Sequence, residues 1–190
     1  QPDRVEAHTG LTTLFAVVKA YDQSIEHADQ VLAIDPQNTE VMGVKAFALV
    51  GIGEAEKGRQ LAVKTLELEP GNTEAAGVIS QLYIDDGDFP AALKTLRSAS
   101  DANPDEPRLS LKMAFVLEQM GDKEALEREL RLLAEKNPEV NAYANALAGF
   151  YVRDARFSEA ETVVRKFATD NPESNDAKKY LFSFLRQHVS

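Results

Sequence analysis

Five of the eight prolines in this 190-residue chain recur at one fixed interval. Each subtraction of neighbouring numbers gives 34, and the five prolines are Pro36, Pro70, Pro104, Pro138 and Pro172. Because a chance scatter rarely produces equal steps, the spacing predicts an array of repeated units. A unit of this length holds two helices joined by a turn, and such units stack on their neighbours.

Counting back from each proline divides the chain into five repeats and a final segment, which we expect to form one continuous domain over residues 1–190. The repeats are 5–38, 39–72, 73–106, 107–140 and 141–174, and the final segment is 175–190. Small residues support this register, because two helices of one unit can approach closely only where side chains are small. One repeat position holds Thr12, Ala46, Ser80, Ala114 and Ala148, and another holds Ser24, Gly58, Ala92 and Ala160, with Leu126 as the exception.

Turn and cap residues recur in the same register. The turns expected between paired helices hold Gly53, Gly87, Gly121, Lys19 and Ala155. Glycine tolerates the left-handed backbone that ends a helix, so the lysine and alanine are less favourable there. Asn38 and Asn72 are expected N-caps of the following helices, and Pro107 suits a first helical turn.

The small-residue pairs, Gly87-Asp88-Phe89 and the proline series resemble the tetratricopeptide repeat family over essentially the whole chain. The resemblance is to bacterial tandem repeats. It implies an all-α fold, an α–α superhelix of five helix-turn-helix units in which 175–190 is a terminal solvating helix. It also implies that the first helices line a concave face on which ligands commonly lie.

Composition limits the class of partner. The net charge of −10 argues against nonspecific binding to nucleic acid or anionic lipid. The chain has no cysteine, no apolar run long enough to cross a membrane and no targeting segment, so cytoplasm and periplasm both stay open. Since the chain begins with Gln1, we expect it to be a fragment or a processed product.

The sequence predicts no enzyme, no cofactor and no metal site. The histidines, His8, His27 and His188, are far apart in the repeat register and form no His-Glu-x-x-His pair. Glycine-rich phosphate loops and the Gly-x-Ser-x-Gly nucleophile turn are missing as well. Solvated or packed histidines are the expected outcome.

The register nominates a peptide- or protein-binding surface on the first helices. Its residues are Phe47, Val78, Gln81, Ile84, Arg108, Lys112, Phe115 and Asn145. The apolar members could form a groove for an amphipathic helix or an extended peptide, with Gly43 and Gly77 letting the partner backbone approach closely. The alternative is that these residues pack between adjacent first helices or against further repeats.

Arg108 and Lys112 are one helical turn apart and could hold a carboxylate. Related modules that grip a chaperone tail use such a basic pair together with Lys and Asn in the two preceding units. Here those places hold Gly43, Phe47 and Val78, so recognition of that tail is not expected. The alternative is a solvated basic pair that balances nearby acids such as Asp85 or Glu118.

The leading hypothesis is therefore a non-catalytic scaffold that binds a peptide or protein segment on its concave face. One alternative is a self-assembly module, in which Val17 and Val18 of the first repeat meet another copy or a missing repeat. The other is a regulatory repeat domain of a larger protein. Neither the partner nor the pathway follows from the sequence.

Overall fold

The computed structural model describes residues 2–188, and within them the chain forms eleven α-helices and no strand. The helices are α1 (Pro2–Val17), α2 (Tyr21–Leu32), α3 (Thr39–Gly51), α4 (Ala55–Leu68), α5 (Thr73–Asp85), α6 (Phe89–Ala102), α7 (Pro107–Met120), α8 (Lys123–Lys136), α9 (Asn141–Arg153), α10 (Phe157–Asp170) and α11 (Asn175–His188). The all-α prediction is confirmed. Each expected repeat contains one odd-numbered and one even-numbered helix, here called its first and second helix.

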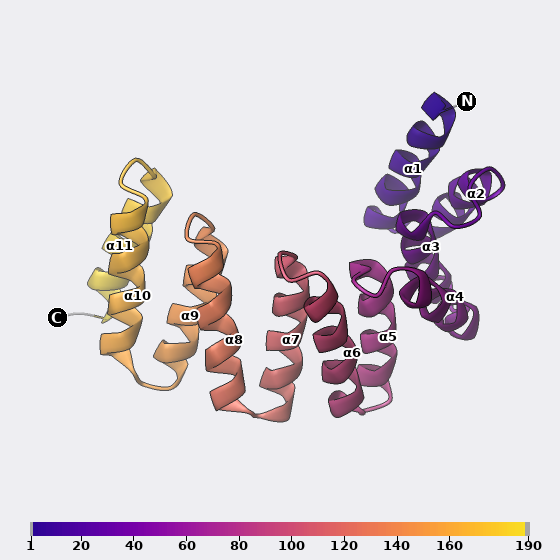
Figure 1. The fold of residues 1–190 in the computed structure, drawn as a ribbon. Coiled ribbons are helices and arrows are strands. Elements are labelled where there is room, and N and C mark those ends of the chain that lie inside the picture. Colours follow the sequence, from indigo (N-terminus) through magenta and orange to yellow (C-terminus); the bar gives the residue numbers. More distant parts are fainter. Residues whose placement is uncertain (1, 189–190) are drawn as a thin grey trace. The chain divides into compact units, whose positions relative to one another are not determined.

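The chain divides into two compact units, residues up to Met120 and residues from Gly121 onward. Unit 1 contains α1 to α7, and unit 2 contains α8 to α11. The boundary falls between the two helices of the fourth expected repeat, so the expectation of one continuous domain stays a prediction. Figure 1 shows the helices of each unit.

In unit 1 the helices form stacked hairpins. Each of α1, α3 and α5 packs on the second helix of its own repeat and on the next first helix, so that α1 contacts α3, α3 contacts α5 and α5 contacts α7. In unit 2, α8 packs on α9, α9 on α10 and α10 on α11. The first helices of unit 1 therefore form one continuous layer, here called the first-helix face.

The small residues lie where the sequence placed them, between paired helices. Ser24 and Thr12 are fully buried, and the Ser24 hydroxyl donates a 2.8 Å hydrogen bond to the Thr12 carbonyl across α2 and α1. A Cβ added to Gly58 would stand 2.8 Å from the carbonyl oxygen of Ala46. Such spacing leaves no room for a larger side chain, since protein interiors are close-packed.

The predicted turns and caps are confirmed. All five turn residues have a positive φ: 87°, 76° and 70° for Gly53, Gly87 and Gly121, 60° for Lys19 and 58° for Ala155. The side chains of Asn38 and Asn72 accept hydrogen bonds from the backbone N–H groups of Val41 and Ala75, at 3.1 and 3.0 Å. These caps satisfy amide groups that the first turn of a helix leaves unpaired.

Asn72 also joins the starts of two successive first helices. Besides capping α5, its side-chain amide donates to the carbonyl of Thr39, the first residue of α3, at 3.1 Å. In unit 2 the side chain of Asn171 donates to the carbonyl of Pro138 at 2.8 Å. Polar side chains at repeat junctions thus hold neighbouring units in register.

Candidate peptide-binding site

Two adjoining hollows open on the first-helix face of unit 1. The first, called the apolar hollow, has a volume of about 300 Å³. It is lined by Thr13, Ala16, Val17, Lys19, Tyr21, Val44, Phe47, Glu74 and Arg108. These residues come from α1, α3, α5 and α7, with two from the turn after α1 and the start of α2. Four consecutive repeats therefore contribute to one depression.

The second, called the acidic hollow, has a volume of about 360 Å³. Its lining residues are Thr13, Thr39, Glu40, Val44, Glu69, Gly71, Asn72, Thr73, Glu74, Asn103, Glu106 and Arg108. The two hollows are neighbours, because they share the lining residues Thr13, Val44, Glu74 and Arg108. The two hollows together are called the first-helix groove.

Phe47 is the aromatic anchor of the apolar hollow. Its side chain is 42% exposed, and its ring meets the Tyr21 ring edge-on with centroids 5.8 Å apart. Tyr21 can lie there because Gly51 of α3 has no side chain: a Cβ at Gly51 would stand 2.4 Å from the tyrosine ring. Val17, 73% exposed, completes an apolar rim that would seat a large hydrophobic side chain.

Arg108 stands between the two hollows and is already paired with acids. Its guanidinium donates through Nε and Nη2 to the two carboxylate oxygens of Glu106, each at 3.0 Å, and through Nη1 to Glu74 at 2.7 Å. The hydrogen bonds from Arg108 hold the pKa of the Glu106 carboxyl below its usual range. The structure therefore favours the ion-paired alternative for Arg108 over an unoccupied binding site for a ligand carboxylate. Its acidic partners are Glu106 and Glu74.

Lys112 lies across Gly77 of the neighbouring helix. A Cβ added to Gly77 would meet the Lys112 Nζ at 3.1 Å and Cε at 3.2 Å. Gly43 is covered in the same way, since a Cβ there would stand 2.5 Å from the side-chain oxygen of Asn72. The expectation that these glycines admit a partner's backbone is wrong for Gly43, where the start of α5 occupies the space, whereas Gly77 is covered only by the movable end of the Lys112 side chain.

Val78 belongs to the core of unit 1. It is 4% exposed and clusters with Ala46, Ala62, Ala75, Ile79 and Leu82. For Val78 the packing alternative therefore holds, and the residue is removed from the candidate surface. The side chain is buried because α5 is covered by α3, α4, α6 and α7.

The other predicted residues differ in their surroundings. Gln81 and Phe115 are exposed, on α5 and α7, and they share one repeat position with Phe47 on α3. Ile84, one turn beyond Gln81, is half-buried. Phe47, Gln81 and Phe115 thus form an exposed row across three packed first helices, although only Phe47 lines the first-helix groove.

Asn145 lies in unit 2, on α9, and is half-buried. Its side-chain oxygen is buried and accepts no hydrogen bond within residues 2–188. The other seven predicted residues belong to unit 1. Sequence reasoning missed the part of Tyr21 and Glu74 in the groove. Tyr21 begins a second helix, whereas the repeat register points to first helices only.

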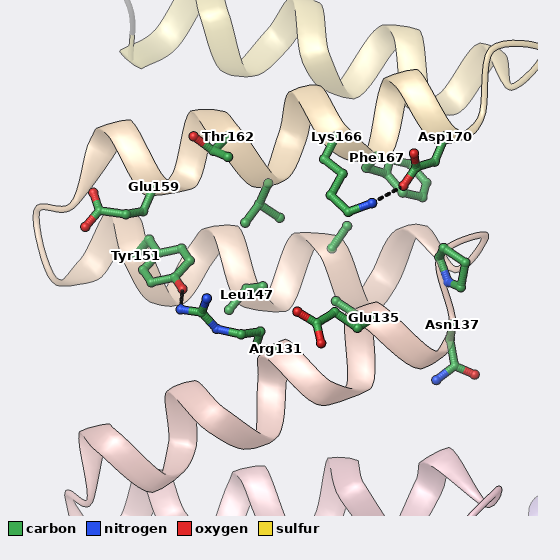
Figure 2. Close-up of a pocket in the computed structure, with 14 residues that line it drawn as sticks. Arg131, Glu135, Asn137, Leu147, Tyr151, Glu159, Thr162, Lys166, Phe167 and Asp170 are labelled. Carbon is green, nitrogen blue, oxygen red and sulfur yellow. Dashed lines mark hydrogen bonds and ion pairs between the residues drawn. The ribbon is translucent and has the colours of Figure 1, made fainter.

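A different kind of groove lies between consecutive second helices. In unit 2 a cavity of about 320 Å³ lies between α8 and α10 above α9, with Leu147, Tyr151 and Phe167 among its walls (Figure 2). In unit 1 a cavity of about 530 Å³ lies between α4 and α6 above α5. Every residue that lines the unit 1 cavity stands 68 positions, or two repeats, before a residue that lines the unit 2 cavity. Tyr83 and Tyr151 are one such pair. Both are therefore general products of repeat stacking.

The second repeat has a lysine where the other grooves have an apolar floor residue. The floor of these grooves holds Ile79 in one repeat and Leu147 in another, and the second repeat has Lys45 at this place. The Lys45 ammonium forms an ion pair with Asp29 of α2. A lysine is tolerated at this place because its methylene stem can pack along the fold while its ammonium pairs with an exposed carboxylate.

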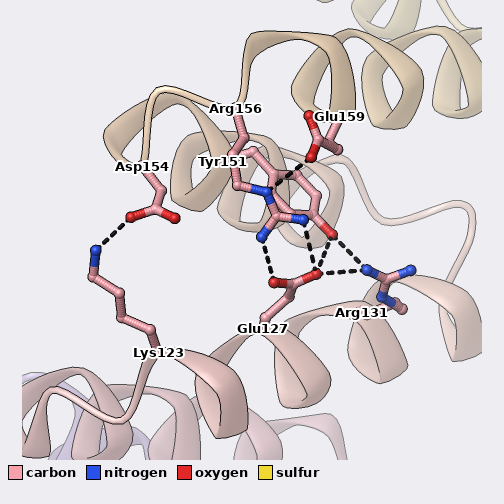
Figure 3. A network of polar contacts seen from close by, with 7 residues as sticks. All are labelled: Lys123, Glu127, Arg131, Tyr151, Asp154, Arg156 and Glu159. Carbon is pink, nitrogen blue, oxygen red and sulfur yellow. Dashed lines mark hydrogen bonds and ion pairs between the residues drawn. The ribbon is translucent and has the colours of Figure 1, made fainter.

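A polar network closes one end of the groove in unit 2. Figure 3 shows Glu127 facing Arg156, Arg131 and Tyr151. Glu127 accepts from Arg131 at 2.6 Å and from the Tyr151 hydroxyl at 3.0 Å, and the Arg156 guanidinium also stacks 4.6 Å from the Tyr151 ring centroid. The hydrogen bond from Arg156, followed by those from Arg131 and Tyr151, lowers the pKa of Glu127 to about 2. The network links α8, α9 and the start of α10 and therefore stabilises the packing of these helices.

The structure corrects the expectation that the histidines are far apart. The Nδ1 atoms of His8 and His27 lie 2.8 Å from each other, and the His27 ring stacks on Phe15. One ring donates its N–H in this hydrogen bond, and the other accepts through an unprotonated ring nitrogen. The two histidines therefore form a packed contact between α1 and α2. His188 lies in unit 2, where its ring contacts Phe184.

Within residues 2–188 no group of three or more His, Cys, Asp or Glu side chains is arranged to hold a metal ion. Over the same range no helix is both long enough and apolar enough to cross a membrane.

Comparison with known proteins agrees with this architecture. A thermophilic tetratricopeptide-repeat protein of Thermus thermophilus is similar with a TM-score of 0.64 at 21% identity, over 95% of this chain and 98% of that chain. The Naa15/Naa10 complex bound to HypK-THB gives 0.65 at 19% identity, over 97% of this chain and 29% of that chain. MamA of Desulfovibrio magneticus RS-1 gives 0.62 at 14% identity, over 91% and 98%.

At these identities the likenesses show the fold alone. A comparison with curated protein sequences finds no match. The sequence itself matches the tetratricopeptide repeat family over residues 18–82 and 83–149, which is more than half of the chain. The protein therefore belongs to the tetratricopeptide repeat family, whose fold is generally a scaffold for protein–protein interactions.

Proposed function

We propose that this protein is a non-catalytic scaffold and that unit 1 binds a peptide or protein segment across its first-helix face. The observation that carries the proposal is the first-helix groove with the half-exposed Phe47 in its wall. The groove is built from four repeats, so an extended or helical segment can contact several helices at once. The family resemblance predicts that this face is the concave one.

The exposed row of Phe47, Gln81 and Phe115 gives the segment a path. These side chains occupy one register position on α3, α5 and α7, and each of these helices packs on the next. Phe115 is 49% exposed, and Gln81 is held by a 2.8 Å hydrogen bond to Asp85. Aromatic side chains at such positions often supply most of the binding free energy of an interface. The absence of catalytic motifs from the sequence supports a binding role without chemistry.

Affinity capture on the immobilised chain, followed by mass spectrometry, tests this proposal. The same capture is made with Phe47→Ala, with Phe115→Ala and with Phe182→Ala. Phe182 is the matched control, because it is an exposed phenylalanine on α11 of unit 2. We expect Phe47→Ala to lose a defined set of partners, Phe115→Ala to weaken them and Phe182→Ala to retain them.

Thermal unfolding of each variant separates docking from folding. Truncating an exposed phenylalanine should change the midpoint little, whereas a core phenylalanine would lower the free energy of unfolding by roughly 3–5 kcal/mol. Partners that are captured equally by Phe47→Ala and the control would contradict the proposal. A large loss of stability in Phe47→Ala would instead assign this residue to the core.

A second candidate function is self-association through the first repeat. Val17 and Val18 at the end of α1 are exposed. Copies that cover these residues would show a mass that rises with concentration in analytical ultracentrifugation. A mass of one chain at all concentrations would exclude this function and leave the scaffold proposal unaffected.

A further inference from the structure

The acidic hollow carries more negative charge than its arginine balances. Its lining contains four carboxylates and one guanidinium, a formal net charge of −3, and the carboxylates belong to Glu40, Glu69, Glu74 and Glu106. Arg108 is engaged by Glu74 and Glu106, as described above. A cation that enters the hollow would thus meet a local field of favourable sign.

Two of these carboxylates have no cationic partner in the part of the chain that the structure describes. There, neither Glu40 nor Glu69 forms an ion pair, and both side chains are exposed. Glu69 accepts a 2.8 Å hydrogen bond from the Asn72 side chain, which fixes its carboxylate at the edge of the hollow. An incoming ammonium or guanidinium can therefore pair with Glu69 without breaking an existing ion pair.

The charge is joined to an apolar seat. The acidic and apolar hollows share Thr13, Val44, Glu74 and Arg108, so one ligand can occupy both. The apolar hollow presents Val17, Tyr21 and Phe47, which suit a large aliphatic or aromatic side chain. An anionic ligand, by contrast, would have to displace Glu74 or Glu106 from Arg108 and would face the remaining carboxylates.

We infer that the first-helix groove selects a peptide segment in which a Lys or Arg stands within a few residues of a large apolar side chain. The apolar side chain enters between Val17 and Phe47, and the cation lies beside Glu40 and Glu69. This inference rests on the proposed function and specifies the chemistry of its partner. The chain's net charge of −10 further favours encounter with a basic segment.

Selection from a phage-displayed library of random dodecapeptides tests the inference. The library is selected in parallel on the wild-type chain and on Phe47→Ala, and peptides that need Phe47 are synthesised with a fluorescent label. We expect them to combine Lys or Arg with Leu, Ile, Phe, Tyr or Trp. Their affinities are then measured by fluorescence anisotropy.

Matched charge variants separate the hollow from the general field of the protein. The double variant Glu40→Gln with Glu69→Gln removes two charges from the hollow, and Glu26→Gln with Glu56→Gln removes two exposed charges from the second helices α2 and α4. We expect the first pair to weaken binding roughly tenfold, and the second pair and Phe182→Ala to leave it within about twofold. Replacing the basic residue of the peptide by Glu should abolish binding.

The outcomes distinguish the inference from the function on which it rests. Peptides that need Phe47 but are neutral or acidic would overturn the inference and leave the scaffold function standing. The inference is overturned in the same way if both double variants weaken binding equally, because the attraction then comes from net charge alone. If no selected peptide distinguishes wild type from Phe47→Ala, the groove is not a docking site and both proposals fail.

Discussion

Arg108 donates a 2.7 Å hydrogen bond to Glu74, the residue 34 positions before it. The two side chains hold the same place at the start of α7 and α5, so successive repeats carry opposite charges at equivalent positions and pair directly. The two side chains are 58% and 39% accessible to solvent, which limits what the pair contributes to stability. Its main consequence is local: it keeps the guanidinium at the edge of the first-helix groove.

A double-mutant cycle with Glu74→Gln and Arg108→Gln measures this pair. We expect a coupling free energy below about 1 kcal/mol from urea unfolding, falling further in high salt, because an exposed ion pair is screened. A coupling of several kcal/mol that salt does not alter would show that the pair is structural instead. The variant Lys57→Gln, which breaks an exposed pair with Glu54 in the same unit, provides the reference.

Gly43 and Gly77 occupy one repeat position but should respond differently to alanine. At Gly43 a Cβ would stand 2.5 Å from the Asn72 oxygen that caps α5, so Gly43→Ala should lower the free energy of unfolding by roughly 1–2 kcal/mol through loss of this cap. At Gly77 the nearest atoms are the far end of Lys112, which can move.

Gly77→Ala should therefore be neutral or stabilise by up to about 1 kcal/mol, as alanine favours helix over glycine. Gly10→Ala on α1 is the control for helix propensity alone, since nothing lies within 4 Å of its added Cβ. Thermal unfolding followed by circular dichroism ranks the three variants. Equal destabilisation at positions 43 and 77 would contradict the assignment of their neighbours.

Glu127 should make the stability of unit 2 sensitive to acid. Its pKa in the folded protein is about 2, below the ordinary value of 4.5, because Arg156, Arg131 and Tyr151 donate hydrogen bonds to the carboxylate. A depressed carboxyl pKa stabilises the fold above the unfolded value, and this contribution is lost as the pH falls from about 4.5 toward 2.

The comparison of wild type with Glu127→Gln over pH 7 to 3 tests this sign. The variant should melt at a lower temperature at neutral pH, and the difference should shrink as the solution is acidified. Glu161→Gln is the control, because within residues 2–188 the ion pair of Glu161 is with Arg165 alone, one turn away. A difference that stays constant with pH would show that Glu127 acts through packing rather than charge.

Ala155 occupies a turn position at which three other repeats have glycine. Its φ of 58° places it in the left-handed region, which costs an ordinary residue roughly 1–2 kcal/mol. We expect Ala155→Gly to stabilise the chain by up to about 1 kcal/mol once the greater freedom of unfolded glycine is counted. Ala33→Gly, at the end of α2 with a φ of −69°, should destabilise it, and a loss in both variants would contradict the argument from strain.

The periodic features of the fold could be predicted from the sequence because they depend on local chemistry. First helices begin at Thr39, Thr73, Pro107, Asn141 and Asn175, each 34 residues after the last, as the proline series requires. Asparagine caps and positive-φ turns depend on residues that are close in the sequence, and the small residues lie at close crossings within one helix pair. The family and the all-α class follow from them.

The candidate site was predicted only in part, since exposure depends on the neighbouring repeat. Val78 and Phe47 were equally apolar candidates in the sequence, yet the structure buries the first and half-exposes the second. Likewise, the sequence does not show which acids pair with Arg108, and the structure places Glu74 and Glu106 beside it.

The sequence by itself therefore determined the repeat, its helices and the face on which the first helices lie. The tertiary structure decided which side chains on that face remain open and which charges remain unbalanced. The reason is physical: helix formation and capping are local, whereas burial and ion pairing arise between residues about one repeat apart, as in Asn72 with Thr39 and Arg108 with Glu74. The sequence predicted an apolar and basic surface, and these contacts give instead a groove that consists of the apolar hollow and the acidic hollow.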